Sequence, residues 1–265
     1  MRPPSTLPDP FPEPRFRALD GHAELAVAEA AASGAPRPLK VSAVLEAVLD
    51  RIGGEPSTRA ARRVSAAGRE WLLHRAALRF GGAGEWFETQ CDACGARFDL
   101  RLSLRDIPRA SPTAAFPVAE VETSIGVRSF EAPNGGHEEA FARRGSEDPR
   151  RVFAALCGLS DRAEAEAIRF HADDLELIDT ALEAASPDIA DGVDAVCPDC
   201  GSEIRARIDP LDFAFPTIDR VLGEVHLIAS AYHWSEASIL DMSLSRRAAY
   251  ARLIGAEQRS GRRLS

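Results

Sequence analysis

Two short cysteine motifs constrain the fold of this chain more than any other part of its sequence. The first is Cys91-Asp92-Ala93-Cys94-Gly95, and the second is Cys197-Pro198-Asp199-Cys200-Gly201. Two thiols in a C-x-x-C-G turn can occupy one side of a tetrahedral Zn²⁺, and the glycine permits the backbone conformation that such a turn requires. Two such turns would make a closed four-thiolate site. We therefore expect one structural Zn²⁺, bound by Cys91, Cys94, Cys197 and Cys200.

The residues after each motif alternate between apolar and charged side chains in the same register. This alternation runs over Phe98–Leu102 after the first motif and over Ile204–Ile208 after the second. A period of two is typical of β-strands. Each motif is therefore expected to lie between two strands, so that the metal joins the two halves of a split zinc ribbon.

The separation of the motifs is large for a zinc site. Residues 95 to 196, 102 in all, lie between Cys94 and Cys197, whereas the pairs of a compact site are typically about 15 to 20 residues apart. Loop-closure entropy grows only logarithmically with loop length, so a folded insert is tolerable. A redox dithiol or disulfides are the alternatives. A thioredoxin-like site would need one C-x-x-C at a strand-to-helix junction, and a catalytic zinc would need an open coordination position.

The composition is that of a globular, acidic protein. The chain has 265 residues, of which 45% are hydrophobic, enough for one large domain or two small ones. Its formal charge of −9 disfavours broad nucleic-acid binding. Apolar runs are too short for a membrane span, and prolines stand where a secretory signal needs an apolar segment. We expect a cytoplasmic protein, in which zinc sites and free thiols persist, with Cys157 as a buried hydrophobic side chain.

These patterns predict an α+β fold, with the split four-cysteine zinc ribbon between helical segments, a mixed α/β insert and a C-terminal three-helix unit. The expected segments are a proline-rich arm with a marginal helix (1–40), a helical segment with the first knuckle (41–104), inserted strands and helices (105–190), the second knuckle (191–215), C-terminal helices (216–256) and a polar tail (257–265). The arm has six prolines among its first 14 residues, which favours an extended, solvated chain.

Apolar spacing and capping residues locate two helices before the first motif. One is expected to begin at Ser42 and to end at Gly53, and the other to begin after Ser65 and to end at Gly81. The strand that follows contains Trp86-Phe87. We expect these two aromatic side chains to pack the ribbon against the helices.

The insert is expected to contain two strands and four helices. The strands are expected at 118–121 and 127–130, and the helices at about 137–143, 149–157, 161–169 and 173–185. The acidic face of the last helix, which includes Asp174, is expected to be solvated. After the second motif, Thr217, Ser235 and Ser243 are expected to cap three helices of a compact unit, the last ending near Ile254.

Known catalytic motifs are missing from the sequence. His137-Glu138-Glu139 lacks the second histidine of a metalloprotease helix, and Gly81–Gly84 lacks the Lys-Ser/Thr pair of a phosphate-binding loop. No G-x-S-x-G nucleophile motif occurs either. We therefore expect a protein that is not an enzyme.

The C-terminal sequence resembles a known family. Glu224–Ala229, Tyr232–Glu236 and Ile239-Leu240 are similar to the C-terminal signature of T4-type baseplate and tail-assembly proteins, which belong to contractile-tail phages and phage-tail-like injection systems. Other segments follow the order of the same family, namely Gly68–Leu73, Phe80-Gly81, the first motif, Ala132–Gly135, the second motif with Asp209-Pro210, and Arg246-Arg247 with Tyr250. The resemblance covers Val41 to Ile254. It implies a baseplate or assembly factor.

We therefore expect a non-enzymatic baseplate or tail-assembly protein that is cytoplasmic or incorporated into a tail particle. Its partners would be baseplate or tail proteins, with no nucleic acid and no membrane. Large aromatic residues and arginines carry most of the binding energy at protein interfaces. The candidates for partner binding are Tyr232, Trp234, Arg246, Arg247 and Tyr250.

The alternative is a zinc-ribbon adaptor of another macromolecular complex, for example a transcriptional one. A basic face on the ribbon would favour this alternative. The arginines that could form it are Arg97, Arg101, Arg205 and Arg207. The same arginines could simply offset the charge of four thiolates.

Overall fold

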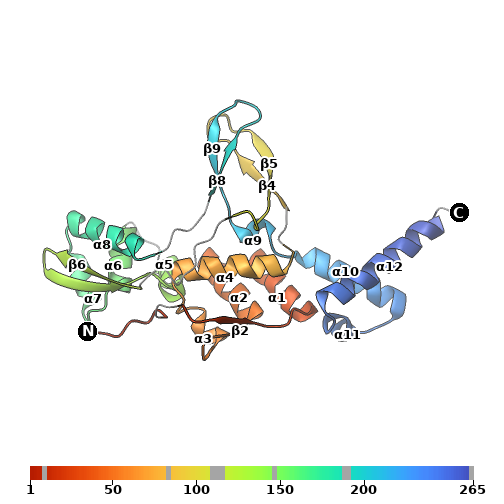
Figure 1. Cartoon of the computed structure of the whole chain (residues 1–265), viewed down its shortest axis with the longest axis horizontal. Coiled ribbons are helices and arrows are strands. Elements are labelled where there is room, and N and C mark those ends of the chain that lie inside the picture. The colour runs from red at the N-terminus through yellow and green to blue at the C-terminus, as the bar shows by residue number, and fades with distance from the viewer. Residues whose placement is uncertain (8–10, 82–84, 108–116, 145–147, 187–191, 263–265) are drawn as a thin grey trace.

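The chain forms an elongated molecule with a helical centre and three parts attached to it (Figure 1). The computed structural model describes residues 1–7, 11–81, 85–107, 117–144, 148–186 and 192–262. The insert lies at one end of the long axis and the C-terminal helices lie at the other, while the two hairpins with the cysteine motifs stand on one side between them. The fold is mixed α/β with small antiparallel sheets, as predicted.

Helices from both ends of the chain form the centre. They are α1 (Gly21–Ala32), α2 (Arg37–Val48), α3 (Ser57–Ala60), α4 (Ala66–Arg79) and α9 (Pro210–Phe213). The side chains of Asp20 and Ser65 accept hydrogen bonds from the first turns of α1 and α4, which fixes where these helices begin. The helix predicted after Ser65 is therefore confirmed. Leu45 and Leu72 are fully buried where α2 and α4 pack together.

A small antiparallel sheet lies beside these helices. It contains β1 (Pro14–Phe16), β2 (Leu49–Ile52) and β3 (Glu55–Pro56) in the order β1-β2-β3. The helix predicted from Ser42 to Gly53 is consequently wrong at both ends, because α2 starts at Arg37 and β2 takes its expected last turn. The apolar residues at 49 and 52 suit either a helix or a strand. Pairing of β2 with the distant β1 selects the strand.

The N-terminal arm packs against the rest of the protein. Phe11 lies edge-to-face with Trp71, with 5.9 Å between the ring centroids, and Thr6 is buried. The amide of Leu7 donates to the carbonyl oxygen of Arg63 at 2.8 Å. The prediction of a solvated arm is therefore wrong. The arm is extended, but the apolar side chains between its prolines contribute to the core.

The insert has a hydrophobic core of its own. It comprises β6 (Val118–Thr123), β7 (Gly126–Glu131), α5 (Gly135–Arg144), α6 (Pro149–Cys157), α7 (Ala163–Arg169) and α8 (Ala172–Ala184). Phe130 and Cys157 lie in this core. The predicted strands and helices are confirmed, but the acidic face of α8 is not fully solvated. Asp174 is buried because it accepts hydrogen bonds from Ser124 and from the amide of His171.

The three C-terminal helices form a unit that also packs on α1. They are α10 (Ile218–Tyr232), α11 (Glu236–Leu240) and α12 (Leu244–Arg262). Thr217 and Ser235 cap the first two, as predicted. α12 continues past Ile254 and Gly255, because residues 256–259 (Ala-Glu-Gln-Arg) are strong helix formers. The tail expected from 257 is thus helical to 262, and its last residues, 263–265, lie outside the described part.

Arg247 anchors the C-terminal helices to the centre instead of facing solvent. Its side chain and that of Glu24 in α1 are each 1% exposed and form an ion pair. Its Nε atom also donates to Glu224 Oε2 at 2.9 Å, and Arg220 pairs with the other oxygen of Glu24. The prediction of Arg247 as an exposed partner contact is therefore wrong. Carboxylates from two helices hold it in the interior.

Arg247→Ala should lower the free energy of unfolding by about 3 to 5 kcal/mol, because it leaves the buried Glu24 carboxylate without its main partner. The neighbouring Arg246→Ala removes an exposed side chain and should change this free energy by about 0.5 kcal/mol or less. Urea denaturation of both variants measures the difference. Equal effects would contradict the buried ion pair.

Candidate functional site

Two hairpins with the same local geometry bring the four motif cysteines together. The first is formed by β4 (Glu85–Gln90) and β5 (Arg97–Leu102), and the second by β8 (Gly192–Val196) and β9 (Glu203–Arg207). In each turn the glycine amide donates to the carbonyl oxygen of the first cysteine, at 2.8 Å for Gly95 and 3.0 Å for Gly201. Both glycines have positive φ values, 74° and 73°. The repeated C-x-x-C-G sequence thus folds into the same turn twice.

The sulfur atoms lie at distances suited to one tetrahedral metal. Cys91 Sγ is 3.7 Å from Cys200 Sγ, and Cys94 Sγ is 3.7 Å from Cys197 Sγ. All four sulfurs lie within 4.8 Å of one another. With metal–sulfur bonds of about 2.3 Å, a tetrahedron has edges of about 3.8 Å. The cluster predicted from the motifs is therefore assembled, and it could hold a metal.

The thiols of the cluster differ in acidity. Hydrogen bonds from Ser202 lower the pKa of Cys200 to about 6. The amide of Ala96 favours the Cys94 thiolate, but hydrogen bonds with the other thiols outweigh it and raise the pKa of Cys94 to about 12. Hydrogen bonds among the thiols thus favour one thiolate, that of Cys200, over ionisation of Cys94, whereas a divalent metal deprotonates all the thiols that bind it. The donor set fits a metal ion better than four free thiols.

The geometry of the cluster is closed. Four protein ligands complete a tetrahedral shell, so a bound metal keeps no position for a substrate or an activated water. Among the described residues, this is the one group of three or more metal-ligating side chains close enough to share an ion. Such a site can join two chain segments, but it cannot perform metal catalysis.

One of the two predicted aromatic contacts attaches the first cysteine hairpin, β4-β5, to the centre. Phe87 stacks on Phe213 of α9, with ring centroids 5.4 Å apart. Trp86 points the other way and is 64% exposed, so its predicted packing role is wrong. Successive side chains of a strand face opposite sides. Only one of two neighbouring aromatic residues can therefore reach the helices.

Four of the five residues predicted to bind a partner gather at the joint between α10 and α12. Trp234 stacks on Tyr232 at 4.9 Å and meets Tyr250 edge-on at 5.2 Å, measured between ring centroids. The guanidinium of Arg246 lies 5.8 Å from the centre of the Tyr250 ring. Tyr232 and Trp234 are 37% and 36% exposed. We call these four residues the aromatic corner.

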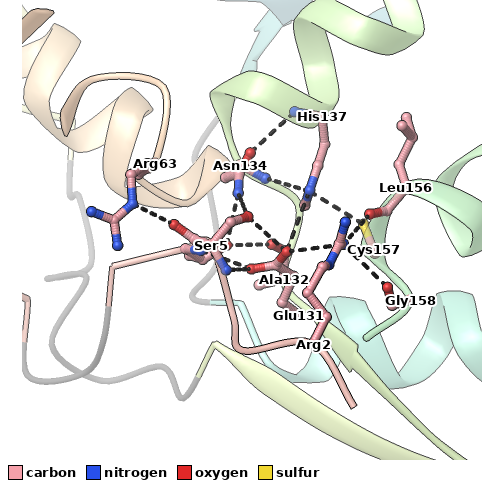
Figure 2. Close-up of polar contacts among 11 residues, drawn as sticks. Arg2, Ser5, Arg63, Glu131, Ala132, Asn134, His137, Leu156, Cys157 and Gly158 are labelled. Atoms are coloured by element: carbon pink, nitrogen blue, oxygen red, sulfur yellow. Dashed lines mark hydrogen bonds and ion pairs between the residues drawn. The ribbon is translucent and has the colours of Figure 1, made fainter. Parts of the chain in front are cut away.

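A second polar cluster, which the sequence analysis missed, fixes the N-terminal arm to the insert (Figure 2). Glu131 is fully buried and accepts hydrogen bonds from the amide of Ser5 at 2.6 Å, the hydroxyl of Ser5 at 2.7 Å and the amide of Thr6 at 2.7 Å. Arg2 lies 3.8 Å from the same carboxylate. The detectable signal was a glutamate that directly follows Phe130 at the end of β7, but the residues of the arm that donate to it lie 125 or 126 positions away.

The same cluster contains a cysteine, a histidine and a carboxylate in line. Cys157 Sγ lies 3.6 Å from His137 Nδ1, and His137 Nε2 lies 3.5 Å from Glu131 Oε1. In enzymes with a nucleophilic cysteine, a histidine next to the thiol acts as its base, and a third group orients the histidine. However, Cys157 is fully buried, and burial raises the pKa of its thiol and lowers the pKa of His137. A protonated thiol closed to solvent is a poor nucleophile, so Cys157 is a packing residue, as predicted.

Comparisons with family models, with curated proteins and with solved structures find no match to this chain. Within the described residues, every helix is too short or too polar to cross a membrane. Any function must therefore be inferred from the site geometry and from the sequence resemblance.

Glu131→Gln should loosen the arm, because it removes the charge that Arg2 and three hydrogen bonds from Ser5 and Thr6 satisfy. A hydrogen bond to a charged group contributes about 1.5 to 3 kcal/mol, so amide exchange in residues 1–7 should accelerate roughly tenfold or more. Hydrogen exchange with mass spectrometry measures this.

The matched control is Glu120→Gln, which changes an exposed carboxylate on the same hairpin. It should leave exchange in the arm unchanged. Arm protection that survives Glu131→Gln, or that falls equally in both variants, would contradict the anchoring role of Glu131.

Proposed function

We propose that this chain is a non-enzymatic assembly protein of a contractile phage tail or a phage-tail-like injection system, stabilised by one structural Zn²⁺. The observation that carries the zinc proposal is the set of four thiols at tetrahedral spacing. Soft thiolate ligands in a tetrahedron favour Zn²⁺ or an iron–sulfur cluster. Both hairpins have the glycine turns that suit a zinc ribbon, and a single Zn²⁺ fits sulfurs that are 3.7 Å apart.

The assembly role rests on the sequence resemblance and on the aromatic corner. Aromatic side chains that are stacked and partly exposed lose little entropy when a partner covers them, and they are frequent at the centre of interfaces. Tyr232, Trp234 and Tyr250 have this arrangement, and Arg246 adds a charge beside them. The corner also coincides with the segment that resembles the baseplate family.

The adaptor alternative has less support from the ribbon surface. Arg97 pairs with Glu88 at 3.3 Å, and Arg205 pairs with Asp194 at 3.6 Å, both across a hairpin. Half of the arginines that would form a basic face are therefore offset by carboxylates of their own hairpin. This pairing favours a structural role for the ribbon over nucleic-acid contact.

The purified protein should contain one Zn²⁺ per chain, and Cys197→Ser should lower its melting temperature sharply. The physical reason is that structural zinc contributes on the order of 10 kcal/mol or more in zinc peptides, comparable to the stability of a whole domain. Elemental analysis and thermal denaturation are the measurements.

Cys157→Ala is the matched control for the loss of a buried thiol. It should cost about 1 to 2 kcal/mol and leave the zinc content unchanged. Absence of zinc, or equal destabilisation by the two substitutions, would count against a shared zinc site.

Trp234→Ala should leave the protein folded and yet reduce the yield of tail particles in cells that assemble them. The loss of the ring contacts costs about 0.5 to 1.5 kcal/mol for each pair, in addition to the lost burial of a side chain that is already 36% exposed. Trp86→Ala is the control, because Trp86 is the more exposed tryptophan and lies on the ribbon. The measurements are the particle yield by electron microscopy and the folded state of each variant by circular dichroism. Normal yield with Trp234→Ala, or equal loss with both, would refute docking through the corner.

A further inference from the structure

The N-terminal arm fills a polar groove that distant parts of the chain form together (Figure 2). Glu131 and Asn134 line this groove from the insert, and Arg63 lines it from the helical centre. The side-chain hydrogen bonds between the arm and the groove join positions that are 58 to 156 apart in the sequence. Residues 1–7 themselves form neither a helix nor a strand. The groove therefore binds the arm as it would bind a separate extended peptide.

Main-chain groups hold the arm near both of its ends. The amide of Arg2 donates to the carbonyl oxygen of Leu159 at 2.7 Å, and the amide of Leu7 donates to that of Arg63 at 2.8 Å. Arg63 Nε also donates to the carbonyl oxygen of Ser5 at 2.8 Å. Proteins that bind extended peptides use such main-chain contacts for affinity and side-chain contacts for specificity.

Side chains make the groove selective for particular residues of the arm. The hydroxyl of Ser5 donates to Glu131 Oε1 at 2.7 Å. Asn134 Nδ2 donates to the hydroxyl oxygens of Ser5 and Thr6 at 3.1 and 3.0 Å. The guanidinium of Arg2 donates to a carbonyl oxygen at the end of α6 at 3.2 Å and lies 3.8 Å from Glu131. The groove thus recognises an arginine that is followed, after two residues, by Ser-Thr.

Without an occupant, the groove would contain buried groups that have lost their partners. Glu131 is 0% exposed and Asn134 is 2% exposed. The arm supplies hydrogen-bond donors to the carboxylate of the first and acceptors to the amide nitrogen of the second. A buried charge without its partner is costly. The site therefore requires a ligand with two neighbouring main-chain amides, a hydroxyl and a cation.

Polar contacts provide most of the attachment of residues 1–7. Thr6 is the one buried side chain among them, whereas Met1 is 87% exposed. Segments with few buried apolar contacts open locally at a low cost in free energy. The arm can therefore leave the groove while the insert stays folded, provided that another ligand satisfies Glu131.

We propose that this groove is an exchangeable peptide site, and that its second ligand is the arm of another copy of this chain. Exchange replaces each contact by an identical one, so the chain's own arm is favoured only by its tether, which gives it an effective concentration of about millimolar. Reciprocal exchange fills both grooves and closes a two-fold dimer. Seven residues span at most about 25 Å, so the two copies must lie side by side. The exchange depends on neither the zinc site nor the tail role proposed above.

Two complementary full-length variants test the exchange. Glu131→Gln weakens the groove and releases an intact arm, whereas Arg2→Ala/Ser5→Ala keeps an intact groove beside a weakened arm. Each variant alone should be monomeric. Their equimolar mixture should form a heterodimer, because only the mixture offers a free intact arm together with an open intact groove. Size-exclusion chromatography with light scattering, over a series of concentrations, measures the mass.

The matched control replaces Glu131→Gln in the mixture by Glu120→Gln, which changes an exposed carboxylate on the same hairpin. Its arm stays in its own groove, so the mixture should contain at least about tenfold less heterodimer. Circular dichroism verifies that each variant is folded. If Arg2→Ala/Ser5→Ala is unfolded, Ser5→Ala alone takes its place, because it keeps the contacts of Arg2 with Glu131 and the end of α6.

A fluorescent peptide with the sequence of residues 1–7 provides an independent measurement. It should bind Arg2→Ala/Ser5→Ala at least about tenfold more tightly than the unaltered protein, in which the chain's own arm competes for the groove. It should also raise the melting temperature of that variant, because a ligand that binds only the folded state stabilises it. A scrambled peptide of the same composition should do neither.

Three outcomes would overturn the proposal. A mixture that stays monomeric, with no binding of the peptide, would make the arm a fixed part of its own chain. Equal amounts of heterodimer with Glu131→Gln and with Glu120→Gln would place the contact between copies outside the groove. Equal binding of the scrambled peptide would mean that the groove does not select the sequence of the arm.

Discussion

Four sulfur atoms bring together two hairpins whose cysteines are 103 and 109 residues apart, one hairpin before the insert and one after it. Each cysteine hairpin is a two-stranded sheet of its own, and an isolated hairpin is at best marginally stable in water. The first hairpin gains support from Phe87 on Phe213, which ties it to α9. A metal held by Cys91, Cys94, Cys197 and Cys200 would fix the second hairpin to the first, and so would fix both ends of the insert.

Buried charges make the other connections between parts of the chain. Glu131 joins the arm to the insert, and Glu24 with Arg247 joins α1 to α12. Arg69, which is 1% exposed, donates to the hydroxyl of Ser42 in α2 and pairs with Glu138 in α5. A buried charge without its partner is costly. A shift of either part would leave a buried charge unpaired, so each of these ion pairs favours one relative position of the parts it joins. Apolar contacts alone would be less specific.

The sequence predicted features that depend on neighbouring residues and missed those that depend on distant ones. The cysteine turns, the caps at Ser65 and Thr217 and the hairpin of the insert follow from local patterns, and all are present. The assembly of the metal cluster could also be predicted, because the two motifs match each other. It could not be predicted that residues 49–52 form β2 instead of a last helical turn, since their partner strand β1 lies more than 30 residues earlier. Arg247 was misjudged for the same reason. Its partner Glu24 is 223 positions away, and a lone arginine in an amphipathic helix is usually exposed.

The order of the cysteines along the chain also bears on how the protein is made. Cys91 and Cys94 leave the ribosome before the insert, and Cys197 and Cys200 leave after it. At about 5 to 20 residues per second, synthesis of the intervening segment takes roughly 5 to 20 seconds. During that time the first pair can offer a metal only two protein ligands. A chain that stops within the insert never completes the tetrahedron, so full coordination would distinguish chains that extend past Cys200 from chains that stop before it.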